Sequence, residues 1–415
     1  MKIAIVGSGI AGLTCAYLLN RQHDIQVFEA SDWIGGHTHT VDVEVQGRSY
    51  AIDTGFIVFN DWTYPNFIRL LEQIGVGFKP TEMSFSVSDP ASGVEYNGHD
   101  LNTLFAQRSN LLSPAFWGML RDILRFNRQS LDDLANNRIS ADTTLGQYLD
   151  SNGYGRRFIE HYIVPMGSAI WSMSLADMLG FPLQFFVRFC KNHGLLSVSD
   201  RPTWQVIEGG SRSYVAPLTA SFAERIRLNC PVSRVVRDQD GVTLHSAAGS
   251  ERFDKVIFAC HSDQALALLE QPSEQERDIL GALPYANNDV VLHTDTRLLP
   301  KRKLAWASWN YRLGGPREQM AAVTYDMNIL QGIDSDTTFC VSLNQTAAID
   351  PSKILARFQY AHPQYSLAGT AAQGRWDELL GAQHTYYCGA YWANGFHEDG
   401  VVSALRVARA FGETL

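Results

Sequence analysis

The sequence is poor in cysteine, and the few cysteines are scattered. Six occur in 415 residues, at positions 15, 190, 230, 260, 340 and 388, and none forms a Cys-x-x-Cys pair. This distribution argues against a disulfide framework and against a zinc site, and it favours a reducing cytoplasm. We therefore predict a cytoplasmic protein without a metal site.

Long apolar runs and excess positive charge are also missing. No uninterrupted run of 18 apolar residues occurs, so we expect no membrane span. Attachment to a membrane surface, peripheral to the inner membrane, stays open. The formal net charge is -9, which argues against nucleic-acid binding because phosphate recognition relies on clustered Lys and Arg. The 45% apolar and 19% charged residues are ordinary globular composition, and the length favours two domains.

The first thirty residues predict a β-α-β unit that binds a nucleotide. A β-branched apolar run, Ile3 to Val6, ends at Gly-x-Gly-x-x-Gly, an apolar helix follows, and a second strand ends at Glu29. The glycines permit a tight turn and close approach to a pyrophosphate, the helix start offers free amides, and the acid accepts from a ribose hydroxyl. The predicted contacts are Gly7, Ser8, Gly9, Ile10, Ala11, Gly12, Glu29 and Ala30.

A second glycine pair, Gly35-Gly36, followed by His37 and Thr38, points to the kind of nucleotide. Here the sequence resembles flavin-containing amine oxidases and their relatives, including phytoene-type desaturases, which carry Gly-Gly-Arg after the acid. His37 stands in the place of that Arg, so a side-chain contact is altered while the backbone role of the glycines remains. Thr54, Gly55 and Phe56 resemble the strand end that lies near the flavin ring in that family. The resemblance implies FAD.

The same family pattern continues in the middle and at the end of the chain. Gly209-Gly210 precedes a helix expected over 214–225, Val232 matches the residue whose main chain meets adenine, and 253–260 matches a strand. A strand over 386–390 precedes a helix that runs from 395 to 411, and its start resembles the segment that faces the flavin carbonyl. The predicted contacts there are Gly389, Glu398, Asp399, Gly400 and Val401. Residues 366–386 lack the cysteine that tethers flavin in some relatives, so we predict non-covalent FAD.

These observations predict an α/β fold with two interleaved domains. A Rossmann-like FAD-binding domain of the amine-oxidase type is assigned to 1–56, 204–270 and 376–415. An α+β substrate or cap domain is assigned to 57–203 and 271–375. Alternating segments from Asp289 to Tyr325 predict an antiparallel sheet in its second part.

Two apolar stretches in the middle admit more than one interpretation. Residues 114–134 predict an amphipathic helix whose apolar stripe we assign to the core, with a lipid or partner site as the alternative: Phe116, Trp117, Leu120, Ile123, Leu124 and Leu131. Residues 158–196 are dense in Phe, Met and Trp. They fit an apolar tunnel or a membrane-facing patch, and they also fit a helical cap whose side chains pack on one another.

The resemblance suggests candidates for the reacting site. Amine oxidases flank the flavin with two aromatic rings, and Phe396 takes the place of one; the other is left open among Trp392, Tyr391, Tyr325 and Trp309. His397 is the candidate for proton transfer, because an ordinary imidazole titrates near neutrality. We interpret His37 and His39 as hydrogen-bonded loop residues. The position of the family's water-holding Lys falls at about Asp289, so amine oxidation is in doubt.

A closer resemblance is to bacterial predicted FAD-dependent oxidoreductases associated with cyclopropane fatty-acid synthase-like methyltransferases. It rests on Trp306 to Tyr311, on His362-Pro363, and on the segment from Cys388 to Gly400. It implies desaturase-like hydride transfer from an apolar, acyl-type substrate to flavin N5. Two alternatives remain: an amine oxidase that releases peroxide, and a flavin-binding partner of a lipid methyltransferase without turnover of its own.

Overall fold

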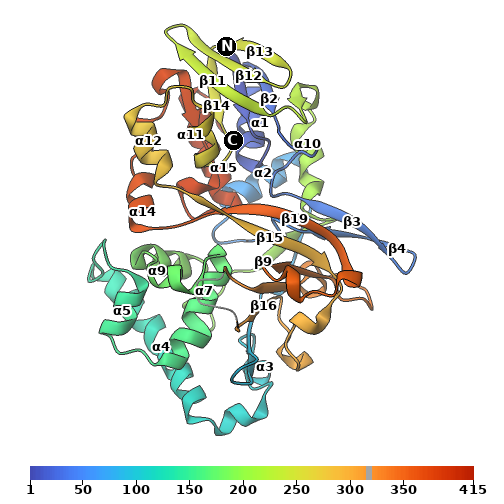
Figure 1. Cartoon of the computed structure of the whole chain (residues 1–415), viewed down its shortest axis with the longest axis vertical. Helices are drawn as coiled ribbons and strands as arrows, with labels where there is room; N and C mark the ends of the chain where they lie inside the picture. The colour runs from blue at the N-terminus through green and yellow to red at the C-terminus, as the bar shows by residue number, and fades with distance from the viewer. Residues whose placement is uncertain (315–319) are drawn as a thin grey trace.

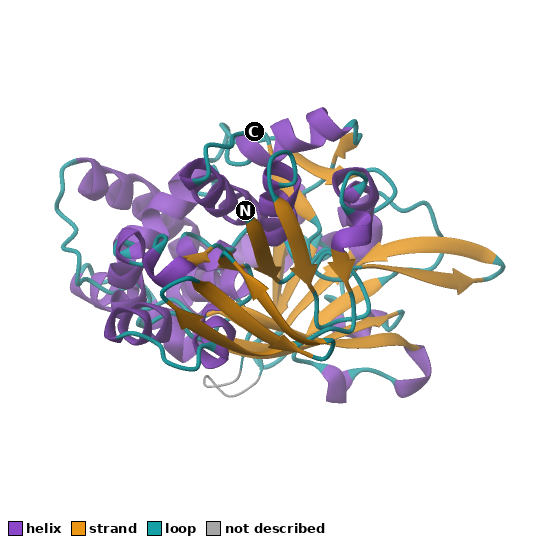
Figure 2. Ribbon diagram, turned by 90° about the horizontal axis from the view of Figure 1, so that it is seen from above, coloured by secondary structure: helices purple, strands orange, loops and turns teal. Residues whose placement is uncertain are grey.

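The structure is a computed structural model that describes residues 1–314 and 320–415 (Figure 1). Both chain ends lie in the upper half of the molecule, and the helices α4 (Pro114–Ala135) and α5 (Leu145–Ser151) lie in the lower half. Seen from above, many of the helices gather at one side of the strands (Figure 2). None of the helices in the described ranges combines the length and apolar character needed to cross a bilayer.

A five-stranded parallel sheet organises the upper half. Its strands run in the order β10 (Ile226–Arg227), β2 (Asp24–Phe28), β1 (Lys2–Val6), β14 (Lys255–Phe258) and β20 (Thr385–Tyr387). Ile3, Ala4 and Ile5 are fully buried, as expected for a strand covered on both faces. Helices α1 (Ile10–Leu19) and α15 (His397–Ala410) pack against one another beside this sheet. The predicted β-α-β unit and the last strand and helix are confirmed.

The helix expected over 214–225 is wrong as one element. The segment forms a 3₁₀ turn at Ser211–Tyr214, helix α10 (Val215–Thr219) and a second 3₁₀ turn at Ala223–Arg225. Pro217 lies in the first turn of α10, where proline is tolerated, and the Thr219 hydroxyl donates to the Val215 carbonyl oxygen at 2.9 Å at the end of the helix. An antiparallel sheet follows: β11 (Val232–Asp238), β12 (Gly241–Ser246) and β13 (Gly249–Phe253).

A seven-stranded sheet crosses the middle of the molecule. Every neighbouring pair is antiparallel except β16 and β7, so the predicted antiparallel sheet is confirmed and gains two strands from the first insertion. Its order is β19 (Ile354–Pro363), β15 (Tyr285–His293), β18 (Cys340–Leu343), β17 (Val323–Asp326), β16 (Trp309–Arg312), β7 (Phe85–Asp89) and β8 (Val94–Asn97). The smaller strands are the hairpin β3 (Thr40–Val45) and β4 (Arg48–Asp53), and the sheet β5 (Val58–Asn60), β9 (Trp204–Ile207) and β6 (Phe78–Pro80).

Helix α4 confirms the amphipathic prediction but corrects its stripe. Phe116, Met119 and Phe126 face the core, whereas Trp117 and Leu124 lie on the outer face with 50% and 59% of their surface exposed. Their assignment to the core is wrong because the buried residues recur from Phe116, one position before Trp117. The other lower helices are α3 (Leu101–Leu104), α6 (Arg156–Phe158), α7 (Val164–Trp171), α8 (Leu175–Leu179) and α9 (Leu183–Asn192).

The aromatic residues of the stretch 158–196 mostly pack on one another. The ring of Trp171 lies 4.4 Å from that of Phe181 and 4.8 Å from that of Phe189, measured between centroids. Phe158 and Phe186 both contact Phe126 of α4. Of the two interpretations, this contact pattern favours the helical cap.

The structure has two large apolar cores, one in each half. The core around the parallel sheet includes residues from segments that the prediction assigns to the cap domain. Among them are Phe67 of α2 (Pro65–Ile74) and Ala372 of α14 (Leu367–Gln373). The remaining helices are α11 (Ser262–Leu268), α12 (Glu274–Gly281) and α13 (Met327–Gln331). The division at residues 56, 203, 270 and 375 stays a prediction.

Candidate active site

The turn after β1 has the geometry that a pyrophosphate needs. Gly7 has a φ of +107°, and a Cβ there would lie 2.8 Å from the carbonyl oxygen of Ala259. A Cβ at Gly12 would lie 2.0 Å from the carbonyl oxygen of Gly7, so the turn closes only with glycine. Gly9 is the N-cap of α1 and supplies no side chain, which leaves the first amides of the helix to an outside acceptor. Ile10 and Ala11 begin that helix.

Glu29 lies at the end of β2 and faces this turn. One carboxylate oxygen accepts hydrogen bonds from the amide and the hydroxyl of Ser8, at 2.9 and 2.7 Å, and the other accepts from the Ser31 amide at 2.8 Å. The chain approaches Val232 beside it, because the Cys230 amide donates to the Glu29 carbonyl oxygen at 2.8 Å. Glu29, the neighbouring Ala30 and Val232 are therefore together at one edge of the sheet.

The loop with Gly35 and Gly36 packs directly on the phosphate turn. A Cβ at Gly36 would lie 3.2 Å from the Cα of Gly9. His37 follows and is buried, and its Nε2 has no hydrogen-bond partner within the described ranges. Burial lowers the pKa of His37, so the ring is neutral at pH 7. The interpretation of His37 as a hydrogen-bonded loop residue is confirmed in part, because the ring bonds the backbone of Ala361 while its Nε2 has no partner in the described part of the chain. His39 bonds the Tyr360 hydroxyl at 2.7 Å.

Thr38 joins this loop to the start of α15. Its hydroxyl oxygen lies 2.5 Å from the Tyr214 hydroxyl and 3.0 Å from Nε2 of His397. The His397 ring stacks on Phe56 with 3.5 Å between centroids. Burial lowers the pKa of His397 well below its usual range, so the expectation that it titrates near neutrality is wrong. His397 acts here as a neutral hydrogen-bonding group.

The strand end after β4 lies against the same loop. The Phe56 amide donates to the His37 carbonyl oxygen at 2.7 Å, and a Cβ at Gly55 would lie 2.2 Å from that oxygen. The Thr54 hydroxyl bonds the His39 carbonyl oxygen at 3.0 Å and the Tyr360 hydroxyl at 2.8 Å. This places Thr54, Gly55 and Phe56 beside the second glycine pair.

The start of α15 meets the start of α1. A Cβ at Gly400 would lie 2.7 Å from Cγ2 of Ile10, and Val401 is fully buried next to it. At the end of β20, the Gly389 amide donates to the Ser403 hydroxyl at 2.8 Å. The two ends of the chain thus bring two helix N-termini together.

The acidic residues of the first turn of α15 are engaged in holding backbone. Asp399 accepts from the amides of Phe396 and Asn394 at 2.9 and 3.1 Å, and burial raises its pKa to about 6. Glu398 accepts from the amides of Asn66 and Phe67 at 3.1 and 2.8 Å, and burial raises its pKa too. Glu398 therefore caps α2, and Asp399 fixes the turn that presents Phe396.

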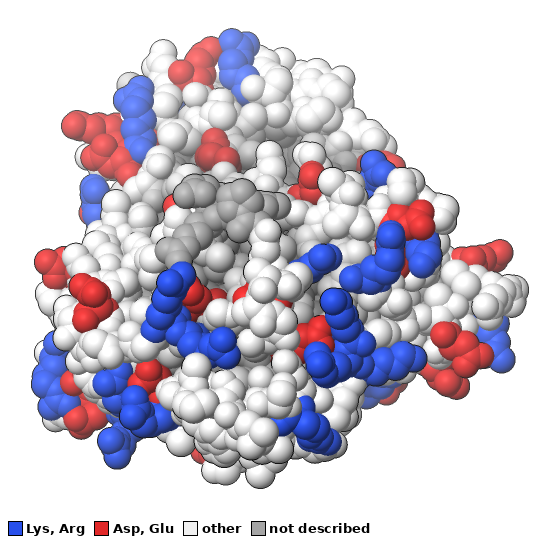
Figure 3. All heavy atoms as spheres, turned by 60° about the horizontal axis from the view of Figure 1, so that its bottom comes forward, with Lys and Arg blue, Asp and Glu red and all other residues white. Residues whose placement is uncertain are grey.

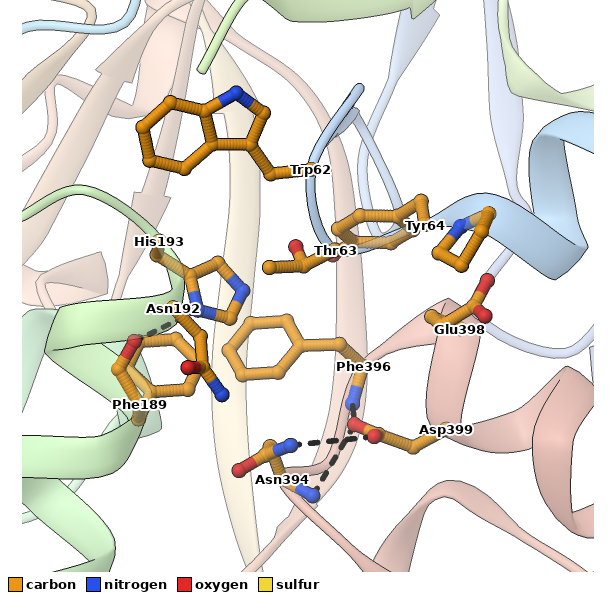
Figure 4. Close-up of a pocket in the computed structure, with 11 residues that line it drawn as sticks. Trp62, Thr63, Tyr64, Phe189, Asn192, His193, Asn394, Phe396, Glu398 and Asp399 are labelled. Carbon is orange, nitrogen blue, oxygen red and sulfur yellow. Dashed lines mark hydrogen bonds between the residues drawn. The ribbon is translucent and has the colours of Figure 1, made fainter. Parts of the chain in front are cut away.

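A cavity of about 390 Å³ opens beside this turn, between α15, α9 and the loop before α2. Four of its lining residues carry a Phe, Trp or Tyr ring: Trp62, Tyr64, Phe189 and Phe396. Figure 4 shows the Phe396 ring pointing toward Phe189 and His193, and the Phe396 and Phe189 rings stack at 5.2 Å. Burial lowers the pKa of His193 to about 4, so this ring is neutral at pH 7.

Two of the four candidates for the second aromatic wall, Trp392 and Tyr325, lie away from this cavity. Trp392 lies in the 3₁₀ turn after Gly389, which directs its ring onto Trp376 at 4.8 Å, and Tyr325 packs on Trp309 at 5.0 Å within the seven-stranded sheet. Neither lines the cavity, where Phe189 is the ring that faces Phe396. The sequence analysis missed Trp62, Tyr64, Asn192 and His193 as site residues. Only the pair of rings ahead of Pro65 offered a local signal.

The arrangement defines a dinucleotide-binding protein of the flavin type. Glycines without room for a Cβ, an uncapped helix start and the partnerless Nε2 of buried His37 all fit a bound FAD. The family model "Flavin containing amine oxidoreductase" matches residues 10–328, and the chain belongs to this family. Membership confirms the predicted fold class, the cofactor FAD and the class of enzyme, an FAD-dependent oxidoreductase; that the FAD is bound non-covalently stays a prediction.

Solved structures repeat this fold over the whole chain. Putrescine oxidase, in a double mutant, is 14% identical with a TM-score of 0.71, covering 99% of this chain and 98% of that one. Cyclohexylamine oxidase from Brevibacterium oxydans IH-35A is 16% identical with a TM-score of 0.67 and the same coverage, 99% and 98%. The CLA-producing fatty acid isomerase from P. acnes is 15% identical with a TM-score of 0.71, again covering 99% and 98%. The comparison with curated proteins finds no match.

Proposed function

We propose that this FAD-dependent oxidoreductase oxidises an apolar, acyl-type substrate that binds in the cavity at the start of α15. The observation that carries the proposal is the lining of this cavity. Its volume of about 390 Å³ falls within the usual range for small-molecule sites, roughly 300–1,000 Å³. Among the residues that the structure describes, no Lys or Arg lines it. The four rings of the lining suit a hydrocarbon segment, and the uncharged side chains of Thr63, Asn192 and Asn394 supply hydrogen-bonding groups for the polar end of an acyl substrate.

In the proposed reaction, the residues of this chain bind and orient the substrate. The rings of Phe189 and Phe396 stack on one another, and together they form an apolar wall that excludes water and against which an apolar chain packs. Asp399 holds the backbone of Phe396, and neutral His193 adds a ring without adding charge. When bound, FAD supplies the two-electron acceptor for a hydride from the substrate. The fatty acid isomerase among the solved structures is a family-fold protein named for an acyl substrate, which agrees with this proposal.

Anaerobic reduction of the bound flavin by acyl compounds tests the proposal. We expect saturated acyl esters or phospholipids to bleach the flavin absorbance. Phe396→Leu should lower the apparent affinity for the acyl compound in this reduction about tenfold, because one aromatic ring contributes roughly 1–1.5 kcal/mol. Phe411→Leu, near the other end of the same helix, is the matched control and should change nothing. Flavin that no acyl compound reduces would contradict the proposal.

A second candidate is amine oxidation with release of peroxide. The observation in its favour is that Glu398 and Asp399 also line the cavity, where carboxylates and rings would attract an ammonium group. The position predicted for the family's lysine, Asp289 on β15, is exposed and bonds Gln359 at 3.2 Å instead. Peroxide assays across a panel of amines distinguish the two: turnover of amines alone would establish this candidate.

The remaining proposals concern the cellular location of the protein and its binding partner. The free cysteines support a cytoplasmic location, and resemblance alone supports a lipid methyltransferase as partner. A flavin-binding protein without turnover, serving that enzyme, is the third candidate. Co-purification with a methyltransferase, combined with flavin that no substrate reduces, would favour it.

A further inference from the structure

The outer face of α4 carries an unusual mixture of side chains. Trp117, Arg121, Leu124 and Arg128 follow one another at helical spacing, and all four are exposed. Large apolar side chains that stay half exposed on an outward helix face leave apolar surface in water, and their clustering marks an interaction surface. Arginines alternate with the apolar residues on this face, whereas an exposed part of a hydrophobic core would be uniformly apolar.

The short turns before α4 extend this face. Leu101 and Leu112 are 77% and 87% exposed, and Leu111 is exposed beside Leu112. The Trp117 indole nitrogen donates to the Leu111 carbonyl oxygen at 2.9 Å, which fixes the ring against the turn at Arg108–Leu112. We call these residues the α4 face: Leu101, Arg108, Leu111, Leu112, Trp117, Arg121, Leu124 and Arg128.

The positive charge of the α4 face is not neutralised. Arg108 donates to the carbonyl oxygens of Asn102 and Phe105, which are neutral partners. Within residues 1–314 and 320–415, Arg121 and Arg128 form no ion pair. Lys303 is exposed on a turn that contacts α3 and adds to the charge. Figure 3, which brings the lower end forward, shows an uncharged bulge with Lys and Arg on both sides.

We propose that the α4 face docks the protein on a membrane surface that contains anionic lipid. Leu112 and Trp117 would enter the interfacial layer, and Arg121 and Arg128 would lie at the depth of the phosphates. The chain as a whole has a net charge of -9. An anionic surface therefore repels the rest of the molecule and attracts this face, which fixes the orientation of docking. The inference is independent of which substrate the cavity takes.

Flotation with vesicles tests the proposal on the FAD-loaded full chain. We expect binding to vesicles of phosphatidylcholine mixed with phosphatidylglycerol, little binding to phosphatidylcholine alone, and weakening by salt. Arg121→Gln with Arg128→Gln should lower the partition coefficient about 25-fold, at about fivefold for each charge near the surface. Leu112→Ser with Trp117→Ala should lower it at least tenfold.

Matched controls remove the same groups elsewhere. Arg48→Gln with Arg409→Gln removes two exposed charges, and Leu355→Ser removes an exposed leucine; both should bind vesicles as the unaltered chain does. Flavin absorbance and the unfolding temperature check that each variant is folded. Equal binding by the α4-face variants and the controls, or no binding by the unaltered chain, would overturn the proposal. So would a concentration-dependent dimer that only the α4-face variants abolish, because the face would then join two copies of the chain.

Discussion

Gly9 and Gly12 stand in the same turn, but the space beside them differs. A Cβ at Gly12 meets the Gly7 carbonyl oxygen at 2.0 Å, whereas a Cβ at Gly9 meets no protein atom within 4 Å. The φ of Gly9 is -67°, which alanine adopts freely. The space beside Gly9 is therefore left for the cofactor, and the space beside Gly12 is filled by the protein.

This difference predicts opposite outcomes for two alanine substitutions. Gly9→Ala should keep the stability of the FAD-free chain but weaken FAD binding at least tenfold, because its methyl group takes up cofactor space. Gly12→Ala should lower the free energy of unfolding by roughly 1–3 kcal/mol, because the turn is overpacked. Denaturant unfolding and titration with FAD measure the two effects. A Gly9→Ala protein with unchanged FAD affinity would show that no ligand lies at this turn.

Residue types at motif positions could be predicted from the sequence, but their states could not. The glycines and Glu29 are recognisable because the turn and the ribose contact demand them at fixed spacing. The neutral state of His397 and the partnerless Nε2 of His37 depend on burial by segments hundreds of residues away. Spacing along the chain carries no information about such burial.

At the scale of elements, helix α2 depends on a residue far away in the chain. Its N-cap, Tyr64, makes no side-chain hydrogen bond to the first turn, and Glu398 of α15 accepts from the amides of Asn66 and Phe67 instead. The cap also positions the loop with Trp62 and Tyr64 at the cavity.

Removing this cap should destabilise the protein. We expect Glu398→Ala to lower the free energy of unfolding by roughly 1–2 kcal/mol, because two helix amides lose their acceptor. Glu398→Gln keeps an acceptor oxygen and should recover at least half of the loss. Denaturant unfolding of both variants gives the comparison. If alanine and glutamine cost the same, the carboxylate charge rather than capping would hold α2.

Periodicity predicted the extent of α4 but not its inward direction. The pattern included Phe116 and Trp117 in one stripe. Both rings contact Phe105, and it is Phe116 that also packs on buried Tyr96 and turns inward. A buried helix face takes in some neighbouring pairs and excludes others, so the pattern alone does not say which of Phe116 and Trp117 turns inward. The sequence leaves that choice to the packing partners.

At the scale of the whole molecule, buried Asp53 connects the two halves. Its carboxylate accepts from the Thr40 hydroxyl at 2.6 Å, the Ser211 amide at 2.9 Å and the side-chain amide of Gln331 at 3.1 Å. Burial raises the pKa of Asp53 to about 6 in spite of these bonds. Thr40 begins β3 and Ser211 begins the 3₁₀ turn after β9, both near the cofactor loop, and Gln331 ends α13 beside the large sheet.

The raised pKa predicts how stability depends on pH. Between the unfolded value of about 3.9 and the folded value of about 6, the folded chain keeps a proton that the unfolded chain loses. The contribution of Asp53 is therefore fully present below about pH 4 and is lost as the pH rises through about 6. Relative to Asp53→Asn, the free energy of unfolding should fall by roughly 1–3 kcal/mol across this window.

Denaturant unfolding of both proteins, from about pH 4 to about pH 7, checks this. The difference between the two proteins removes the contributions of Asp326 and Asp399, whose pKa values burial also raises to about 6. The prediction would be contradicted if the free energy of unfolding of the unaltered chain, relative to that of Asp53→Asn, rose as the pH rises.

The sequence by itself determined the cofactor class, the parallel sheet and the union of the chain ends, because backbone geometry at glycines and strands is local and leaves a pattern. The tertiary structure alone decided which rings enclose the cavity, which histidines are neutral and which face of α4 stays outside. These properties follow from desolvation and packing between segments distant in the chain, and such contacts leave no periodic trace in the order of residues.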